Sequence, residues 1–273
     1  MPRSERAPAP QPEWGELLET ALTVPGSVGN TYIQGHDYSY LNNLRLFSQG
    51  VAEPTTSYRG WQALGRQVMK GSKGYKIIRP ITIKSKTEVD EHGEPKKYMK
   101  FKEVAGAFTY SQTEGEPLDE ALTEQPEWSR DRALGALGIR LVQFADTTLN
   151  SQGYSVGRDI AISPVAAYPL KTTWHELAHV EAGHTSVEGL SDYHAGNRGL
   201  FEFEAEATAY LGMHELGLDH MMNPAESRNY IQTWLHGETP PDASIRKVFK
   251  LTNTILTAGR VAVEESGAEG EVA

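Results

Sequence analysis

The stretch His175-Glu176-Leu177-Ala178-His179 decides how the second half of this chain is interpreted. On an α-helix, residues i and i+4 share a face, so His175 and His179 can present two imidazoles to one metal ion. Glu176 would then lie beside a water held by that ion, where a carboxylate can act as general base. We therefore expect His175 and His179 as metal ligands and Glu176 as the catalytic residue.

The flanking residues favour a strand–loop–helix unit around this stretch. The β-branched run at 160–162 predicts a short strand, and Pro169 suits the first turn of a helix that ends before Gly183. Trp174 and Leu177 would give the helix a buried side. This is the arrangement of a zincin-like metallopeptidase. The alternative is a core helix with two hydrogen-bonded histidines and a surface glutamate.

A catalytic zinc takes three protein ligands and keeps one open position for water. The metzincin pattern is excluded, because Ala182 and Thr185 stand where that class needs a glycine and a histidine. A glutamate from a following helix is the alternative, and Glu202, Glu204 and Glu206 compete for the role. Glu202 and Glu206 lie on one helical face, and Glu204 lies on roughly the opposite one.

We expect Glu204 to be the third ligand of this gluzincin-like set. It shares its face with Thr208 and Leu211, whereas a stripe of small residues occupies another face of the same helix. The other two glutamates are then solvated, or orient a ligand histidine. Imidazole and carboxylate ligands accept several first-row ions, so we expect Zn²⁺ or another divalent metal such as Mn²⁺. An oxyanion-stabilising donor is also needed, and the candidates by position are His184, Tyr193, His194 and Tyr210.

Composition bounds the remaining possibilities. The chain has 273 residues and a mass of 30.1 kDa, enough for one large or two modest domains. It has no cysteine, which excludes disulfides, thiolate ligands and cysteine catalysis and is compatible with a reducing cytoplasm. No apolar run is long enough to cross a bilayer. We expect a cytoplasmic protein with no membrane partner.

Charge divides the chain into two unlike halves. Residues 1–110 carry fifteen Lys and Arg against eleven Asp and Glu, a balance of +4, whereas residues 111–273 carry −14. Within residues 32–86 there are nine basic side chains and two acidic ones. A basic region in an acidic protein indicates a polyanionic partner.

Apolar periodicity and turn residues predict an α+β protein of two domains, a small basic N-terminal domain and a zincin-like C-terminal domain. The expected ranges are 1–12 disordered, 13–111 nucleic-acid-binding domain, 112–131 linker, 132–262 metallopeptidase domain, and 263–273 disordered acidic tail. The expected helices are 14–22, 38–47, 58–70, 169–182, 201–211, 229–235 and 243–257. The expected strands are 75–84, 98–110 (one or two strands), 139–145 and 160–162, with a hairpin tip or small insertion at His92-Gly93.

Basic and aromatic residues alternate in the front half, which is the pattern of surfaces that bind single-stranded nucleic acid. No helix-turn-helix for duplex reading is evident. The expected DNA-binding residues are Arg45, Arg59, Trp61, Arg66, Lys70, Lys73 and Lys76. The alternative is a solvated basic face whose aromatic residues are core.

Several blocks of the chain resemble ArdC-type antirestriction proteins. The blocks are Phe47–Gly50, Tyr58–Val68, Lys70–Gly74, Tyr110–Gly115, His175–His179 with Gly183-His184, and Glu202–Tyr210. They follow one another in family order over most of the chain. The charged segment Lys84–Lys102 is a departure from the pattern.

The resemblance implies a plasmid or phage protein whose front domain binds single-stranded DNA and whose back domain has a metallopeptidase fold. Such a protein would protect incoming DNA of a mobile element from host restriction. Two alternatives stay open. One is a regulatory zinc endopeptidase that cleaves a protein substrate such as a repressor, and the other is a DNA-coating protein whose metal site is purely structural.

Overall fold

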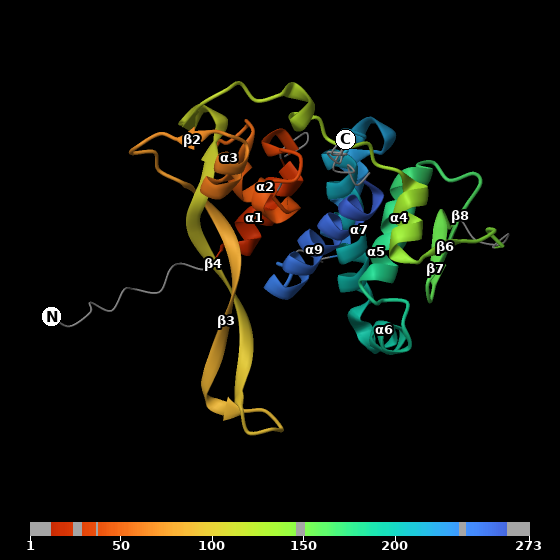
Figure 1. Ribbon diagram of the computed structural model, residues 1–273. Coiled ribbons are helices and arrows are strands. Elements are labelled where there is room, and N and C mark those ends of the chain that lie inside the picture. Colours follow the sequence, from red (N-terminus) through yellow and green to blue (C-terminus); the bar gives the residue numbers. More distant parts are fainter. Residues whose placement is uncertain (1–11, 24–28, 37, 146–150, 235–238, 261–273) are drawn as a thin grey trace, which may run out of the picture.

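The structure, a computed structural model, describes residues 12–23, 29–36, 38–145, 151–234 and 239–260. Over these ranges the chain is α+β, as predicted (Figure 1). The helices are α1 Trp14–Thr23, α2 Tyr40–Phe47, α3 Tyr58–Ala63, α4 Arg130–Leu137, α5 Pro169–Glu181, α6 Val187–Asp192, α7 Arg198–Glu215, α8 Pro224–Trp234 and α9 Asp242–Gly259. The strands are β1 Thr55–Ser57, β2 Gln67–Val68, β3 Tyr75–Val89, β4 Pro95–Thr109, β5 Thr113–Glu114, β6 Arg140–Leu141, β7 Gly153–Val156 and β8 Asp159–Ile162.

The N-terminal part of the chain is built on one long hairpin. Strands β3 and β4 pair antiparallel, and β1 adds to β4 to give the sheet order β1-β4-β3. The helix expected at 58–70 is shorter than predicted. It ends at Ala63 because Gly65 has φ +72°, a left-handed conformation that glycine tolerates best, and β2 then pairs with β5.

The C-terminal part of the chain sets helices α4 and α5 beside a small sheet (Figure 1). The sheet order is β6-β8-β7, with β6 parallel and β7 antiparallel to β8, so β7 is an edge strand. The strand expected at 139–145 is restricted to the two residues of β6. Helix α5 agrees with prediction, because Pro169 occupies its first turn and Gly183 follows it at φ +80°.

Helices α5 and α7 approach each other closely through small residues. Ala205 and Ala209 are fully buried, and a Cβ added to Gly212 would lie 2.3 Å from Cζ3 of Trp174 on α5. The same Trp174 ring stacks on Trp128 with ring centroids 5.2 Å apart. This contact fixes the rotation of α7 toward α5 and therefore decides which α7 side chains reach the histidines.

The largest group of buried apolar residues crosses the expected domain boundary. Residues of α1 and α2, including Leu18 and Leu44, and Ile78 of β3 belong to the same cluster as Trp174 and Phe249. The proposed domain limits, including the linker at 112–131, stay a prediction. The disorder expected for 1–12 and 263–273 falls, Pro12 aside, outside the described residues. Among the helices that the structure describes, none is both long and apolar enough to span a bilayer.

Candidate metal centre

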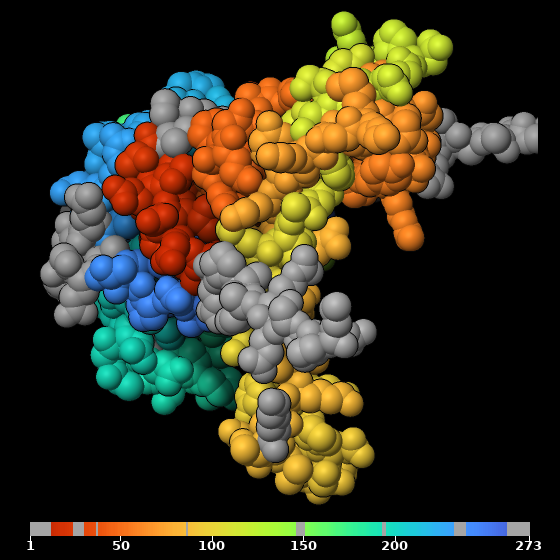
Figure 2. All heavy atoms as spheres, turned by 90° about the vertical axis from the view of Figure 1, so that its left-hand side faces the viewer, coloured from red at the N-terminus to blue at the C-terminus, as the bar shows by residue number. Residues whose placement is uncertain are grey.

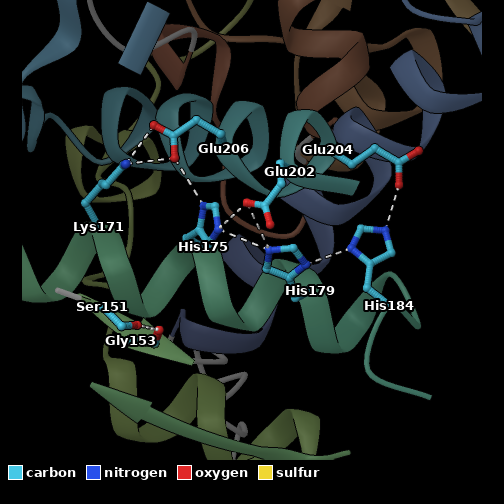
Figure 3. Close-up of polar contacts among 9 residues, drawn as sticks. All are labelled: Ser151, Gly153, Lys171, His175, His179, His184, Glu202, Glu204 and Glu206. Atoms are coloured by element: carbon cyan, nitrogen blue, oxygen red, sulfur yellow. Dashed lines mark hydrogen bonds and ion pairs between the residues drawn. The ribbon is translucent and has the colours of Figure 1, made fainter. Parts of the chain in front are cut away.

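His175, His179 and Glu202 converge on one point between α5 and α7 (Figure 3). Their ligand atoms all lie within 4.8 Å of one another. The two Nε2 atoms are 3.1 Å apart, and Oε2 of Glu202 lies 3.5 Å from Nε2 of His175 and 3.8 Å from Nε2 of His179. Two imidazoles and a carboxylate are a donor set that divalent first-row ions accept.

The structure groups Glu202, and not the expected Glu204, with the two histidines as the carboxylate that could complete a metal site. The small-residue stripe of α7 faces α5, and Glu202 lies on that same face, three residues before Ala205. Glu204 points the other way, toward His184 and Lys247. The sequence did contain the decisive signal, because a stripe of small residues marks the side on which two helices approach, and the ligand had to be on that side.

The ionised carboxylates of the site favour positive charge beside them. Burial alone would raise the pKa of Glu202, but the neighbouring imidazoles of His175 and His179 outweigh it and hold the pKa of Glu202 well below its usual range. Burial would lower the pKa of His175, yet its hydrogen bonds with Glu202 and Glu206 raise it to about 10. A cation at this point would therefore meet carboxylates that are already ionised.

Glu206 holds the first histidine in the tautomer that metal binding needs. Its Oε2 lies 3.1 Å from Nδ1 of His175, and the Lys171 ammonium is 2.6 Å from its Oε1 (Figure 3). Burial works against ionisation, but these two partners lower the pKa of Glu206 to about 2. Since the carboxylate accepts the Nδ1 proton of His175, the proton at Nε2 is the one that a metal ion would displace on binding.

A longer chain of side chains does the same for the second histidine. Nδ1 of His179 lies 2.9 Å from Nδ1 of His184, and Nε2 of His184 lies 2.9 Å from Oε2 of Glu204 (Figure 3). Lys247 contacts the same Glu204 oxygen at 2.8 Å. Burial lowers the pKa of His184, so its ring is neutral and donates only once, to Glu204. Nδ1 of His184 therefore accepts the Nδ1 proton of His179. This leaves the Nε2 lone pair of His179 facing His175 and Glu202.

Glu176 faces the cleft on the open side of this centre. The cleft has a volume of about 850 Å³ and is lined by α5, α7, α8 and the edge strand β7. The Glu176 side chain points toward β7, because a Cβ added to Gly153 would lie 3.3 Å from its Oε1. A carboxylate next to the donor set and an unpaired strand edge thus share one cavity.

Of the oxyanion-donor candidates whose side chains the structure describes, His184 lines this cavity and Tyr210 does not. His184 is buried and belongs to the chain of contacts behind His179. Tyr210 is 1% exposed and donates its hydroxyl to the carbonyl of Leu22. The side chains of Tyr193 and His194 lie outside the described residues. Tyr168 and Tyr230 line the cleft and were not considered from the sequence.

The expected DNA-binding residues separate into two groups. Trp61 is fully buried and donates its Nε1 proton to the carbonyl of Phe108 at 2.7 Å. Arg66 is 6% exposed and binds Thr113 through Nε at 2.8 Å. Arg45 and Lys76 both contact Glu103, at 2.7 and 3.6 Å.

These four contacts are internal, and Trp61 has no surface on which a base could stack. Lys76 nonetheless stays exposed, as do the remaining three residues of the set, Arg59, Lys70 and Lys73. The sequence alone could not separate the two groups, because residue type does not show whether an arginine is buried or exposed.

Comparison with known proteins agrees with this architecture. Residues 16–110 match the family model of the N-terminal domain of anti-restriction factor ArdC. The fold resembles the metal-free crystal structure of antirestriction ArdC protein from the R388 plasmid, with 21% identity, a TM-score of 0.51, and coverage of 90% of this chain and 95% of that chain. It also resembles the Mn(II)-bound structure of that protein, with 19% identity, a TM-score of 0.51, and coverage of 91% and 98%. No curated protein matches the chain.

Proposed function

We propose that this chain, an ArdC-type protein by its N-terminal domain and its fold, acts in antirestriction by binding single-stranded DNA, and that it carries a divalent-metal peptidase centre. The single observation that carries the peptidase part is that His175, His179 and Glu202 converge with Glu176 beside them in one cleft. The relative from the R388 plasmid has a Mn(II)-bound form, which supports a divalent ion here. Zn²⁺ is the other ion that this donor set suits.

The residues fit such an ion chemically. Both imidazoles have their Nδ1 atoms engaged by Glu206 and His184, so both Nε2 atoms can become ligands once an ion displaces the proton shared between them. Glu202 is held ionised. A divalent ion bound there would supply Lewis acidity toward a carbonyl and acidify a bound water.

The chain's own contribution to hydrolysis is positioning and proton transfer. Glu176 would accept the proton of the attacking water at one carboxylate oxygen and later deliver it to the leaving amine. Among the described residues no strand pairs with the outer side of β7, so an extended peptide could add there and lie along the cleft beside Glu176. This arrangement favours a peptide substrate over a compact small molecule.

The DNA-binding part rests on the front of the molecule. Arg59, Lys70 and Lys73 are exposed, and Tyr58 beside them is 42% exposed. Charges that follow phosphates, with a ring on which a base can stack, are what single-stranded DNA requires. Coating of the incoming strand would by itself block a restriction endonuclease, so protection and peptidase activity are separable.

The test is a comparison of the wild type with Glu176→Gln. The metal-loaded proteins are assayed for cleavage of labelled casein and for binding of labelled single-stranded and duplex DNA across a salt series. We expect the variant to lose cleavage and to keep both its bound metal and its DNA affinity. Equal cleavage by both proteins would contradict the role of Glu176, and loss of DNA binding in the variant would contradict two separable functions.

A further inference from the structure

The β3–β4 hairpin projects from the body of the molecule (Figures 1 and 2). Each strand has 15 residues, and only the base is embedded, where Ile77 and Ile78 are 2% and 3% exposed. Further out, from Arg79 to Lys84 and from Lys96 to Lys100, every side chain is exposed. A two-stranded hairpin without a covering layer is only marginally stable in water. An arm of this length therefore suggests a role outside the folded core.

The stem of the hairpin is strongly basic. Within residues 75–85 and 95–109 there is a single acidic side chain, Glu103, and Arg45 and Lys76 already occupy it. The basic residues of the same ranges are Lys76, Arg79, Lys84, Lys96, Lys97, Lys100 and Lys102. The acidic residues of the hairpin are otherwise confined to its end, where Glu88 contacts Lys96 at 3.6 Å.

The register places like charges directly opposite each other. Arg79 pairs with Lys102, and Lys84 pairs with Lys97. Like charges in directly opposed positions destabilise an antiparallel pair. Among the described residues, none of these four cations has a carboxylate within 4.0 Å. The repulsion is not relieved inside the protein, which favours an external polyanion as the partner that relieves it.

One face of the hairpin combines these cations with apolar side chains. Directly opposed residues share a face, and alternate pairs along the strands fall on the same side. The pairs on this side are Arg79 with Lys102, Ile81 with Lys100, and Ile83 with Tyr98. Ile81 and Ile83 are each 37% exposed, and Tyr98 is 43% exposed. We call this surface the hairpin face.

The opposite face is attached to the body at its base. Phe101 packs edge-on against Trp14 of α1 with centroids 5.5 Å apart, and Arg246 of α9 lies over both rings. Beyond that contact this side presents Lys84 and Lys97 without an aromatic ring. The two faces thus carry similar charge but differ in their stacking surface.

We infer that the hairpin face is a contact surface for single-stranded nucleic acid, with phosphates at Arg79, Lys100 and Lys102 and a base stacked on Tyr98. From Arg79 to Ile83 the strand spans roughly 13 Å, which accommodates a few nucleotides. A ribbon that reads duplex DNA from the major groove has no need of an exposed row of apolar and aromatic side chains, whereas a single strand stacks its bases on them. This inference rests on the proposed DNA binding and extends it beyond Arg59, Lys70 and Lys73.

The test compares two double variants of the full chain that remove equal charge from opposite faces. Lys100→Gln with Lys102→Gln changes the hairpin face, and Lys84→Gln with Lys97→Gln is the matched control, because that like-charged pair lies on the opposite face, away from Tyr98. In fluorescence anisotropy with labelled oligothymidylate, we expect the first to lower the slope of log affinity against log salt by about 1.4, for two phosphates of a single strand. Tyr98→Leu should weaken binding by about fivefold or more.

The outcomes separate this inference from the proposed function. The control variant, Lys84→Gln with Lys97→Gln, should bind DNA within about twofold of the wild-type affinity at moderate salt. Its side chains lie on the other face of the hairpin, where salt screens their attraction to the bound strand. Equal losses in both pairs, no loss in Lys100→Gln with Lys102→Gln, or a preference for duplex would overturn the hairpin face while DNA binding by the wild type stands. Absence of any binding by the wild type would overturn both.

Discussion

Nδ1 of His184 lies 2.9 Å from Nδ1 of His179, so a residue that is not itself a candidate ligand determines which nitrogen of His179 faces the cleft. His184 is fixed in turn by Glu204, which is completely buried and contacts Lys247. Tautomer control of this kind acts on metal affinity without touching the ion. Glu204 thus belongs to the centre, but behind the histidine.

Glu204→Gln should lower the affinity for Mn²⁺ or Zn²⁺ by roughly 10- to 100-fold while one ion still binds at saturation. The amide keeps the shape of the carboxylate but no longer fixes the orientation of His184 through its charge. Competition with a metallochromic chelator measures the affinity. Glu215→Gln is the matched control, because Glu215 is also a buried glutamate of α7, 3.8 Å from Arg260 and away from the histidines. Wild-type affinity in Glu204→Gln would show that His184 does not control His179.

Gly212→Ala should destabilise the fold by about 1–3 kcal/mol in urea unfolding. The new methyl group would have to displace Trp174, whose ring carbon lies 2.3 Å from the added Cβ, and α7 would move away from α5. Gly135→Ala in the exposed part of α4 is the control, since nothing lies within 4 Å of its added Cβ. That substitution should be neutral or stabilise by up to about 1 kcal/mol through helix propensity. Equal stability of the two variants would mean that α5 and α7 are not in close contact.

His214 should make the protein less stable in mild acid. Burial lowers the pKa of His214, Asp219 opposes this shift and Arg228 supports it. The folded state then binds the proton more weakly than the unfolded state. The contribution of His214 is therefore fully present above the unfolded pKa of about 6.5 and is lost as pH falls through that value toward the folded pKa.

His214→Phe removes the titrating group and also two ring nitrogens that have no hydrogen-bond partner among the described residues. We expect the variant to lose less unfolding free energy than the wild type between pH 7.5 and 5.5. Urea unfolding at the two pH values measures the difference. Parallel losses would contradict the assignment of this acid sensitivity to His214.

Local signals in the sequence predicted the parts of the fold that depend on neighbouring residues. Pro169 and Gly183 bounded the histidine helix, and alternation predicted strands at 75–84 and 98–110; of the two alternatives for His92-Gly93, the hairpin tip is the one observed. The helix expected at 58–70 was too long because apolar spacing outweighed Gly65, whose positive φ ends the helix. Propensity is a weak guide where a turn and a strand pair compete with it.

The parts that could not be predicted depend on the rotation of one element against another. Glu202 and Glu204 are two residues apart, and only the contact of the small-residue stripe with Trp174 decides that Glu202 reaches the histidines. Arg66 and Trp61 looked like DNA-binding residues by type, but their partners are Thr113 and a backbone carbonyl distant in sequence. Such partners are invisible until the chain is folded.

If His175, His179 and Glu202 form a divalent-metal site, the metal content of purified variants will depend on these three residues. After incubation with Mn²⁺ or Zn²⁺ and removal of free ion, elemental analysis should find one ion per chain in the wild type and in Glu215→Gln. It should find far less than one ion per chain in Glu202→Gln and in His175→Ala. In Glu204→Gln the site should reach one ion per chain when the ion concentration is raised. Full occupancy in Glu202→Gln together with an empty site in Glu204→Gln at every ion concentration would contradict the account.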